Sequence, residues 1–192
     1  PSINVSSQGF TIENLAANAF RPHQQTVYPF PIPEGAAIRM GLDAIKNVGE
    51  GPVELILQSR GDRAFASAMD FAERVDLRQI NRRGLECLIK VGALDCLGGR
   101  GQLLGAVDKL LSASSESHSA KEAGQLTLFG DVGLPMNEEL FALSPDCDHE
   151  VSQREALAWE KELVGVYVSS HPLQQMTVEL TDVITHHTKD IT

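Results

Sequence analysis

The stretch IKNVGEGPVELIL, residues 45–57, places two glycines one position apart between two apolar patterns of helical spacing. Glycine weakens a helix interior, so we expect one helix to end and another to begin at this pair. The spacing predicts Gly51 as the N-cap and Pro52 as the first helical residue, where its missing N–H costs nothing. Because glycine lacks a Cβ and tolerates positive φ, the turn could also let an outside group approach the backbone.

The N–H groups of this turn indicate which kind of outside group could bind there. Those of residues 49–51 would point outward at the positive end of a helix, an arrangement that suits a phosphate. Such a contact reads the DNA backbone rather than the bases, so it would be independent of DNA sequence. The predicted DNA contacts are Lys46, Asn47, Val48, Gly49, Glu50, Gly51 and Arg60. An ordinary helix–helix turn with a glycine C-cap is the alternative interpretation.

The charge distribution decides where an anionic partner could approach. The formal net charge is −10, but residues 104–192 alone hold fifteen acids against five Lys/Arg. Residues 38–103 hold ten Lys/Arg against nine acids, a balance of +1. Only this middle segment would therefore meet a polyanion without general repulsion. Arg82 and Arg83 are further candidates for phosphate contacts within it, although a solvated helix face explains them equally well.

Apolar spacing and composition divide the chain. Two strand-like pieces, GFTIE and AAIRM, flank a proline-rich connector at 21–35. Helical patterns then run to about residue 112, and Asn81 is the expected N-cap of one of them. The small, polar stretch that starts at Ser112 has the composition of a flexible linker. A capping box of Ser152 and Glu155 predicts a final long helix.

One internal echo indicates a duplicated unit. GLDAIKNVG at 41–49 and GLECLIKVG at 84–92 share both glycines, the leucine, the acid and the valine. Two related helix–turn units would explain this echo. The second copy continues with ALD in place of EGP, so it lacks the second glycine.

No catalytic or metal-binding constellation is visible in the sequence. The three cysteines have no CxxC spacing, and the histidines lack ligand spacing with cysteines or acids. We therefore expect no catalytic residue, no metal and no cofactor. No apolar run approaches the ~20 residues that cross a bilayer, so we do not expect a membrane partner. We expect an intracellular, cytoplasmic location.

The glycine pattern resembles the helix-hairpin-helix motif of DNA repair and replication proteins. Three longer stretches, IRMGLDAIKNVGEGPVELIL, FAERVDLRQINRRGLECLIKVGALDCLG and WEKELVGVYVSSHPL, are similar to the alpha subunits of bacterial DNA polymerase III, the C-family replicative polymerases. The resemblance runs from about residue 10 to residue 173. In that family the catalytic palm carboxylates lie upstream, and nothing here matches them.

The resemblance implies a mainly α fold, a tandem helix-hairpin-helix domain with a short β-containing N-terminal segment and a C-terminal helical linker region. Residues 1–37 would be the end of the fingers region, and 38–112 the tandem DNA-binding domain. Residues 113–150 would form a flexible linker with a sliding-clamp motif, and 151–192 a helical approach to a missing OB-fold domain.

The segment QLTLF resembles the internal sliding-clamp motif of the same family. The implied clamp contacts are Gln125, Leu126, Leu128 and Phe129. A short apolar pair in a polar tether cannot bury itself locally, but an anchor that packs back on its own domain is the alternative.

The resemblance thus implies a non-catalytic segment that binds duplex DNA, the sliding clamp (the beta subunit) and the rest of the polymerase holoenzyme. A second possibility is a helix-hairpin-helix module of a DNA repair or ligase-type protein, against which QLTLF and VGVYVSSHPL count. A third is a protein-interaction scaffold, which absence of DNA affinity would favour.

Overall fold

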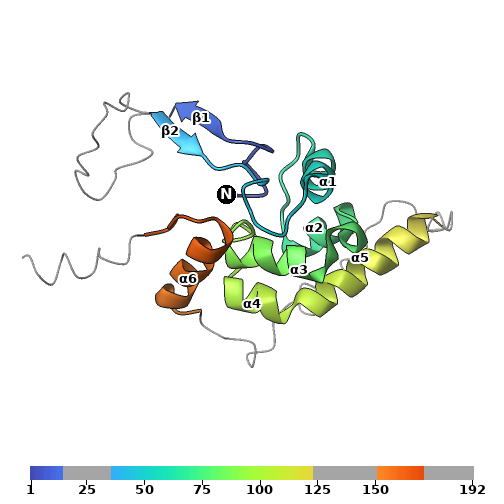
Figure 1. The fold of residues 1–192 in the computed structure, drawn as a ribbon. Coiled ribbons are helices and arrows are strands. Elements are labelled where there is room, and N and C mark those ends of the chain that lie inside the picture. The colour runs from blue at the N-terminus through green and yellow to red at the C-terminus, as the bar shows by residue number, and fades with distance from the viewer. Residues whose placement is uncertain (15–35, 123–150, 171–192) are drawn as a thin grey trace, which may run out of the picture.

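The computed structural model describes residues 1–14, 36–122 and 151–170 of the chain (Figure 1). The strands are β1 (Thr11–Asn14) and β2 (Ala36–Arg39), and the helices are α1 (Glu50–Arg60), α2 (Ala68–Arg74), α3 (Leu77–Lys90), α4 (Arg100–Gly105), α5 (Val107–Glu122) and α6 (Gln153–Leu163). The expected mainly α fold is confirmed. Within these residues, every helix falls short of the length and apolar character that a bilayer span requires.

The two strand-like pieces form an antiparallel ribbon that extends away from the helices (Figure 1). Ile12 lies opposite Ile38 in the register of this ribbon. Where the two strands lead back toward the helices, Gly41 passes so close to Gln8 that a Cβ would collide with its carbonyl. The ribbon and the helical body are therefore joined by a crossing that requires glycine.

Helix α3 lies at the centre of the helical body, against α1, α4, α5 and α6. Its side chains Leu85, Leu88 and Ile89 are fully buried. The helix is interrupted at Asn81, whose φ of 59° is not helical, and the Asn81 side chain accepts a hydrogen bond from the Gly84 amide at 2.9 Å. The predicted N-cap at Asn81 is confirmed, although a further helical turn precedes it.

Helix α5 corrects the predicted start of the linker. We expected flexibility from Ser112, but the helix continues to Glu122. The reason is tertiary: Ser114 is fully buried, and its hydroxyl accepts from the Leu77 amide at 2.9 Å and donates to the Val75 carbonyl at 2.8 Å. Small residues thus let α5 pack closely against the α2–α3 junction. The rest of the predicted linker, 123–150, lies outside the described residues.

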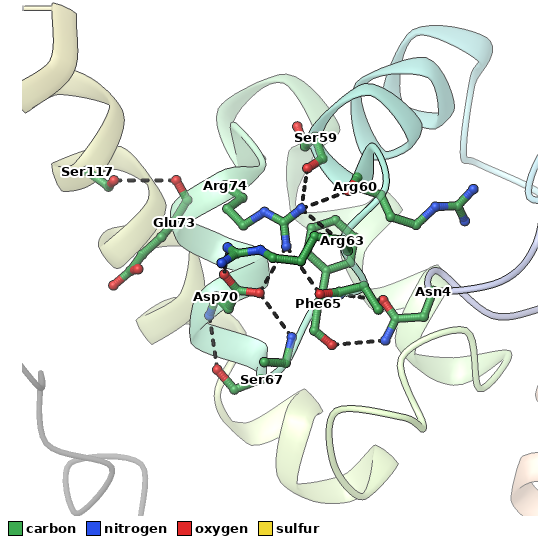
Figure 2. A network of polar contacts seen from close by, with 12 residues as sticks. Asn4, Ser59, Arg60, Arg63, Phe65, Ser67, Asp70, Glu73, Arg74 and Ser117 are labelled. Atoms are coloured by element: carbon green, nitrogen blue, oxygen red, sulfur yellow. Dashed lines mark hydrogen bonds and ion pairs between the residues drawn. The ribbon is translucent and has the colours of Figure 1, made fainter. Parts of the chain in front are cut away.

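Arg74 fixes the connection between α1 and α2, as Figure 2 shows. Its guanidinium lies 4.6 Å from the centroid of the Phe65 ring and donates to Asp70 at 3.1 Å. The same group donates to four main-chain carbonyls, those of Ser59 (2.6 Å), Arg60 (2.9 Å), Arg63 (2.9 Å) and Ala64 (3.4 Å). One side chain therefore binds the last two carbonyls of α1, those of Ser59 and Arg60.

Replacing Arg74 by methionine should lower the free energy of unfolding by about 2–4 kcal/mol, because several partly buried carbonyls would lose their donor. Urea denaturation of both forms measures the change. Arg63→Met is the matched control: its side chain is 73% exposed and pairs with the same Asp70, so a loss below about 1 kcal/mol is expected. Equal losses in the two variants would contradict this role of Arg74.

Candidate nucleic-acid interface

The segment that leads into α1 is a series of tight turns, not a helix. The Ile45 amide bonds to the carbonyl three residues earlier at 3.3 Å, and the Val48 amide does the same at 3.2 Å. The expectation that a first helix ends at the glycine pair is therefore wrong. Asn47 explains why, since its φ of 67° lies in the left-handed region and stops a helix from forming there.

Helix α1 begins two positions earlier than the sequence predicted. Gly49 is the N-cap, with φ −79° and ψ 173°, and the Val53 amide makes the first intrahelical bond to the Gly49 carbonyl at 3.2 Å. The assignment of Gly51 as N-cap and Pro52 as first residue is therefore wrong, because both lie inside the first turn. Pro52 is tolerated there since the first N–H groups of a helix have no intrahelical acceptor.

Neither glycine of the turn uses positive φ, which corrects a second expectation. Among the residues described around this turn, the left-handed conformation belongs to Asn47. A Cβ added at Gly51 would meet no atom within 4 Å, and one added at Gly49 would meet only Pro52 Cδ at 3.9 Å. The fold therefore accepts side chains at both positions. What the two glycines provide is a stretch of bare backbone at the start of a helix.

Most of the predicted DNA contacts of the turn lie on the protein surface. Lys46, Asn47, Gly49, Glu50 and Gly51 are exposed. Val48 is the exception, because its side chain is only 6% exposed and packs into the core, so it could offer an outside group only its backbone.

The structure does not bring Arg60 to this surface. Arg60 ends α1, about 15 Å from its first residue at 1.5 Å per residue. Its Nη1 donates to the carbonyls of Ile3 at 2.9 Å and Ser6 at 2.7 Å. The guanidinium that we predicted to bind phosphate thus anchors the N-terminal segment.

Helices α3 and α6 support the turn from behind. The Lys46 amide donates to the Leu163 carbonyl at the end of α6, at 2.9 Å. The Asn47 side-chain amide lies 3.5 Å from Cys87 Sγ, and a Cβ at Gly84 would come within 3.4 Å of the Asn47 carbonyl. Because two packed helices hold the turn, its amides keep a fixed direction.

A cavity of about 540 Å³ opens beside the turn, between α3 and α6. Its lining includes Asn47, Arg83, Lys90 and Trp159. Sequence reasoning missed the last two. A repeat of Arg83 and Lys90 at helical spacing could have indicated Lys90, whereas no local signal connects Trp159, 69 residues further on, to this place.

The two echoing units differ in conformation. Residues 84–92 belong to α3 and its C-terminal turn, where Gly92 has φ +78°, whereas residues 41–49 are turns that end at Gly49 with φ −79°. After Gly92 the chain turns and starts α4 at Arg100. The second glycine shared by the two units therefore has a different backbone conformation in each of them.

A buried carboxylate, that of Glu160, joins α6 to the segment that follows it and to Arg100, the first residue of α4. It accepts hydrogen bonds from the Val168 amide (2.7 Å), the Ser169 amide (3.0 Å) and the Ser169 hydroxyl (2.7 Å), and Arg100 Nη1 lies 3.3 Å away. Burial pushes the pKa of Glu160 up, but the hydrogen bonds from Ser169 and Val168 and the charge of Arg100 outweigh it. The pKa is therefore held below its ordinary value.

This lowered pKa makes stability depend on acid in one direction. A carboxyl group with a lowered folded pKa stabilises the fold above its unfolded pKa of about 4.3 and loses that contribution as pH falls through the folded value. Glu160→Gln should thus cost about 1–3 kcal/mol at neutral pH and flatten the decline of stability below pH ~4.3. Thermal melts across this range test it, with Glu162→Gln on the same helix as control. Parallel profiles for wild type and Glu160→Gln would contradict the assignment.

Known proteins resemble this region of the chain in sequence. A family model described as the helix-hairpin-helix motif matches residues 1–103, which contain the ribbon, the turn and α1 to α3. The chain belongs to the helix-hairpin-helix family. The turn that leads into α1, residues 46–51, lies within the matched region, and we call it the glycine turn.

Three curated relatives of this helix-hairpin-helix chain share a name. The chain is 37% identical to DNA polymerase III subunit alpha of Vibrio cholerae over 159 residues, which cover 81% of this chain and 13% of the relative. The corresponding protein of Pseudomonas aeruginosa is 34% identical over 170 residues (80% and 14%), and that of Thermus aquaticus is 38% identical over 140 (72% and 11%). The predicted resemblance to these subunits is confirmed. The chain spans about an eighth of the length of these relatives.

Proposed function

We propose that the chain is a non-catalytic segment of a replicative DNA polymerase that holds duplex DNA by its phosphate backbone. The observation that supports the proposal is the exposed backbone of residues 49–51 at the start of α1, bare at Gly49 and Gly51 on either side of Glu50. This stretch lies inside the region that the helix-hairpin-helix model matches. The similarity to DNA polymerase III subunit alpha favours a replicative polymerase over a repair or ligase-type protein.

The proposed contact uses the first amides of α1. Glu50 and Gly51 provide N–H groups that no carbonyl inside the helix can accept, and Pro52 has none. These N–H groups lie at the positive end of the helix dipole, so a phosphate oxygen is a favourable acceptor. Lys46 and Asn47, exposed on the same turn, add a positive charge and a polar side chain. The carboxylate of Glu50 repels an anion, so this contact should be weak by itself.

Salt dependence tests this proposal. The chain should bind labelled duplex DNA weakly, without sequence preference, and with an affinity that falls as salt rises. Two to four phosphate contacts correspond to a slope of about −2 to −4 in log K against log salt concentration. Fluorescence anisotropy at several salt concentrations, with two unrelated duplexes, measures it. A strong preference for one duplex would contradict backbone recognition. Absence of binding at low salt would also contradict it and would favour a protein-interaction scaffold.

The proposal also includes a sliding clamp as partner. The segment that supports it, residues 125–129, lies outside the described residues, and its support is the resemblance of QLTLF to the clamp motif together with the polymerase relatives. The rest of the polymerase holoenzyme and a cytoplasmic location belong to the same proposal. We expect no nucleotide incorporation by this chain on a primed template, and the absence of a metal or cofactor stays a prediction.

A further inference from the structure

The cavity beside the glycine turn contains cations that the proposed contact does not use. It lies where the turn, α3 and α6 meet, and Asn47 belongs both to the turn and to the cavity lining. A DNA strand that contacts the turn would therefore lie beside the cavity, with no helix or β-strand of the protein between them.

Two consecutive arginines of α3 line this cavity but differ in what they contact. Arg82 is engaged: its Nε lies 2.9 Å from Glu86 Oε1, and it also pairs with Asp108 on α5. Arg83 is exposed, and none of the ion pairs found among residues 1–14, 36–122 and 151–170 includes it. Arg82 thus neutralises Glu86 while the charge of Arg83 remains available to a ligand.

Lys90 lies seven positions after Arg83, which places both on the same face of α3. Its Nζ lies 5.6 Å from the centroid of the Trp159 ring, so the aromatic face holds the ammonium at the cavity. Glu162 is the remaining acid of the lining, and it is exposed. With Arg82 and Glu86 paired, the lining keeps an excess of one positive charge.

We propose that this cavity is a second phosphate-binding site, in which Arg83 and Lys90 bind a further phosphodiester group of the DNA strand held by the glycine turn. This inference rests on the proposed function and extends it from the turn across α3 to α6. The close packing of Gly84 against the Asn47 carbonyl, 3.4 Å from an added Cβ, fixes the spacing between the two sites. A phosphate in the cavity would compete with the Trp159 ring for the Lys90 ammonium.

The chain has a single tryptophan, Trp159, so its fluorescence reports on this cavity alone. Titration with a short duplex should change the intensity of Trp159 with the same midpoint as the anisotropy of the labelled DNA. Bound DNA should also protect Trp159 from iodide, an anionic quencher that the same cations attract. DNA binding with an unchanged Trp159 signal and unchanged quenching would overturn the inference while leaving the proposed function intact.

Charge variants inside and outside the cavity test the site. Arg83→Gln and Lys90→Gln should each reduce the magnitude of the salt slope by about 0.9, the value for one lost phosphate contact. Lys109→Gln removes the same charge from an exposed position of α5 that does not line the cavity, and it should leave the slope unchanged. Equal effects of Lys109→Gln and Arg83→Gln would show a general charge effect and overturn the proposed site. Absence of any DNA binding by the wild type would overturn both the site and the proposed function.

Discussion

The double substitution Gly49→Ala and Gly51→Ala should abolish binding of duplex DNA while the helical circular dichroism survives. The added methyl groups would stand where the proposed phosphate approaches the amides of α1. Charge-assisted hydrogen bonds contribute about 1.5–3 kcal/mol each, so losing two would weaken binding at least about a hundredfold. Anisotropy of labelled duplex DNA at low salt measures the effect.

The structure makes this substitution a clean test because the protein itself has room for both methyl groups. A Cβ at Gly51 meets nothing within 4 Å, and that at Gly49 meets Pro52 Cδ at 3.9 Å. Alanine in the first turn gains up to about 1 kcal/mol of helix propensity, which offsets a similar loss at the N-cap. Gly9→Ala, where a Cβ would meet only Asp43 at 3.9 Å, is the matched control and should bind DNA normally. Unchanged affinity in a folded double mutant would rule out the turn as the contact.

The second large effect concerns the sliding clamp. In a complex of the clamp with residues 125–130, burial of Leu128 and Phe129 should contribute roughly 1.5–3 kcal/mol each before ordering costs. Since ordering a tether opposes this gain, we expect a complex in the micromolar range. Replacing both residues by alanine should weaken binding by at least about a hundredfold, at ~1.4 kcal/mol per tenfold.

Calorimetric titration of the cognate clamp with the peptide of residues 125–130 measures this effect. Thr127→Ala changes the one residue of QLTLF that is not an implied clamp contact, and it should bind like the wild type. The double alanine change in the whole chain should leave DNA binding and the melting temperature nearly unaltered. If the wild-type peptide fails to bind, or if the double change lowers the melting temperature by several degrees, the segment is an internal packing anchor instead.

Features decided by local chemistry could be predicted from the sequence. The two strands, the cap at Asn81 and the cap at Ser152 each follow from neighbouring residues, and the structure confirms them. The Ser152 hydroxyl accepts from the Glu155 amide at 3.3 Å, as half of the predicted capping box requires. The final helix nevertheless spans only Gln153–Leu163, shorter than the long helix that we expected.

Features decided by tertiary contacts could not be predicted. Ser114 is helical because distant main-chain groups of Val75 and Leu77 bond to its hydroxyl. Arg60 is held away from the candidate site by hydrogen bonds to carbonyls more than fifty positions away in the chain. The surface at residues 49–51 was correctly located as exposed backbone, but its geometry was misjudged because asparagine, and not glycine, makes the left-handed turn.

The proposed DNA contact is the backbone at the start of α1. Amide chemical shifts, followed by NMR while the isotope-labelled chain is titrated with a short duplex, locate this contact residue by residue. We expect the largest shift changes at the amides of Gly49, Glu50 and Gly51, with smaller ones at Arg83 and Lys90. Saturable DNA binding with undisturbed amides at these three positions, and changes confined to α5 or the β1–β2 ribbon, would contradict it.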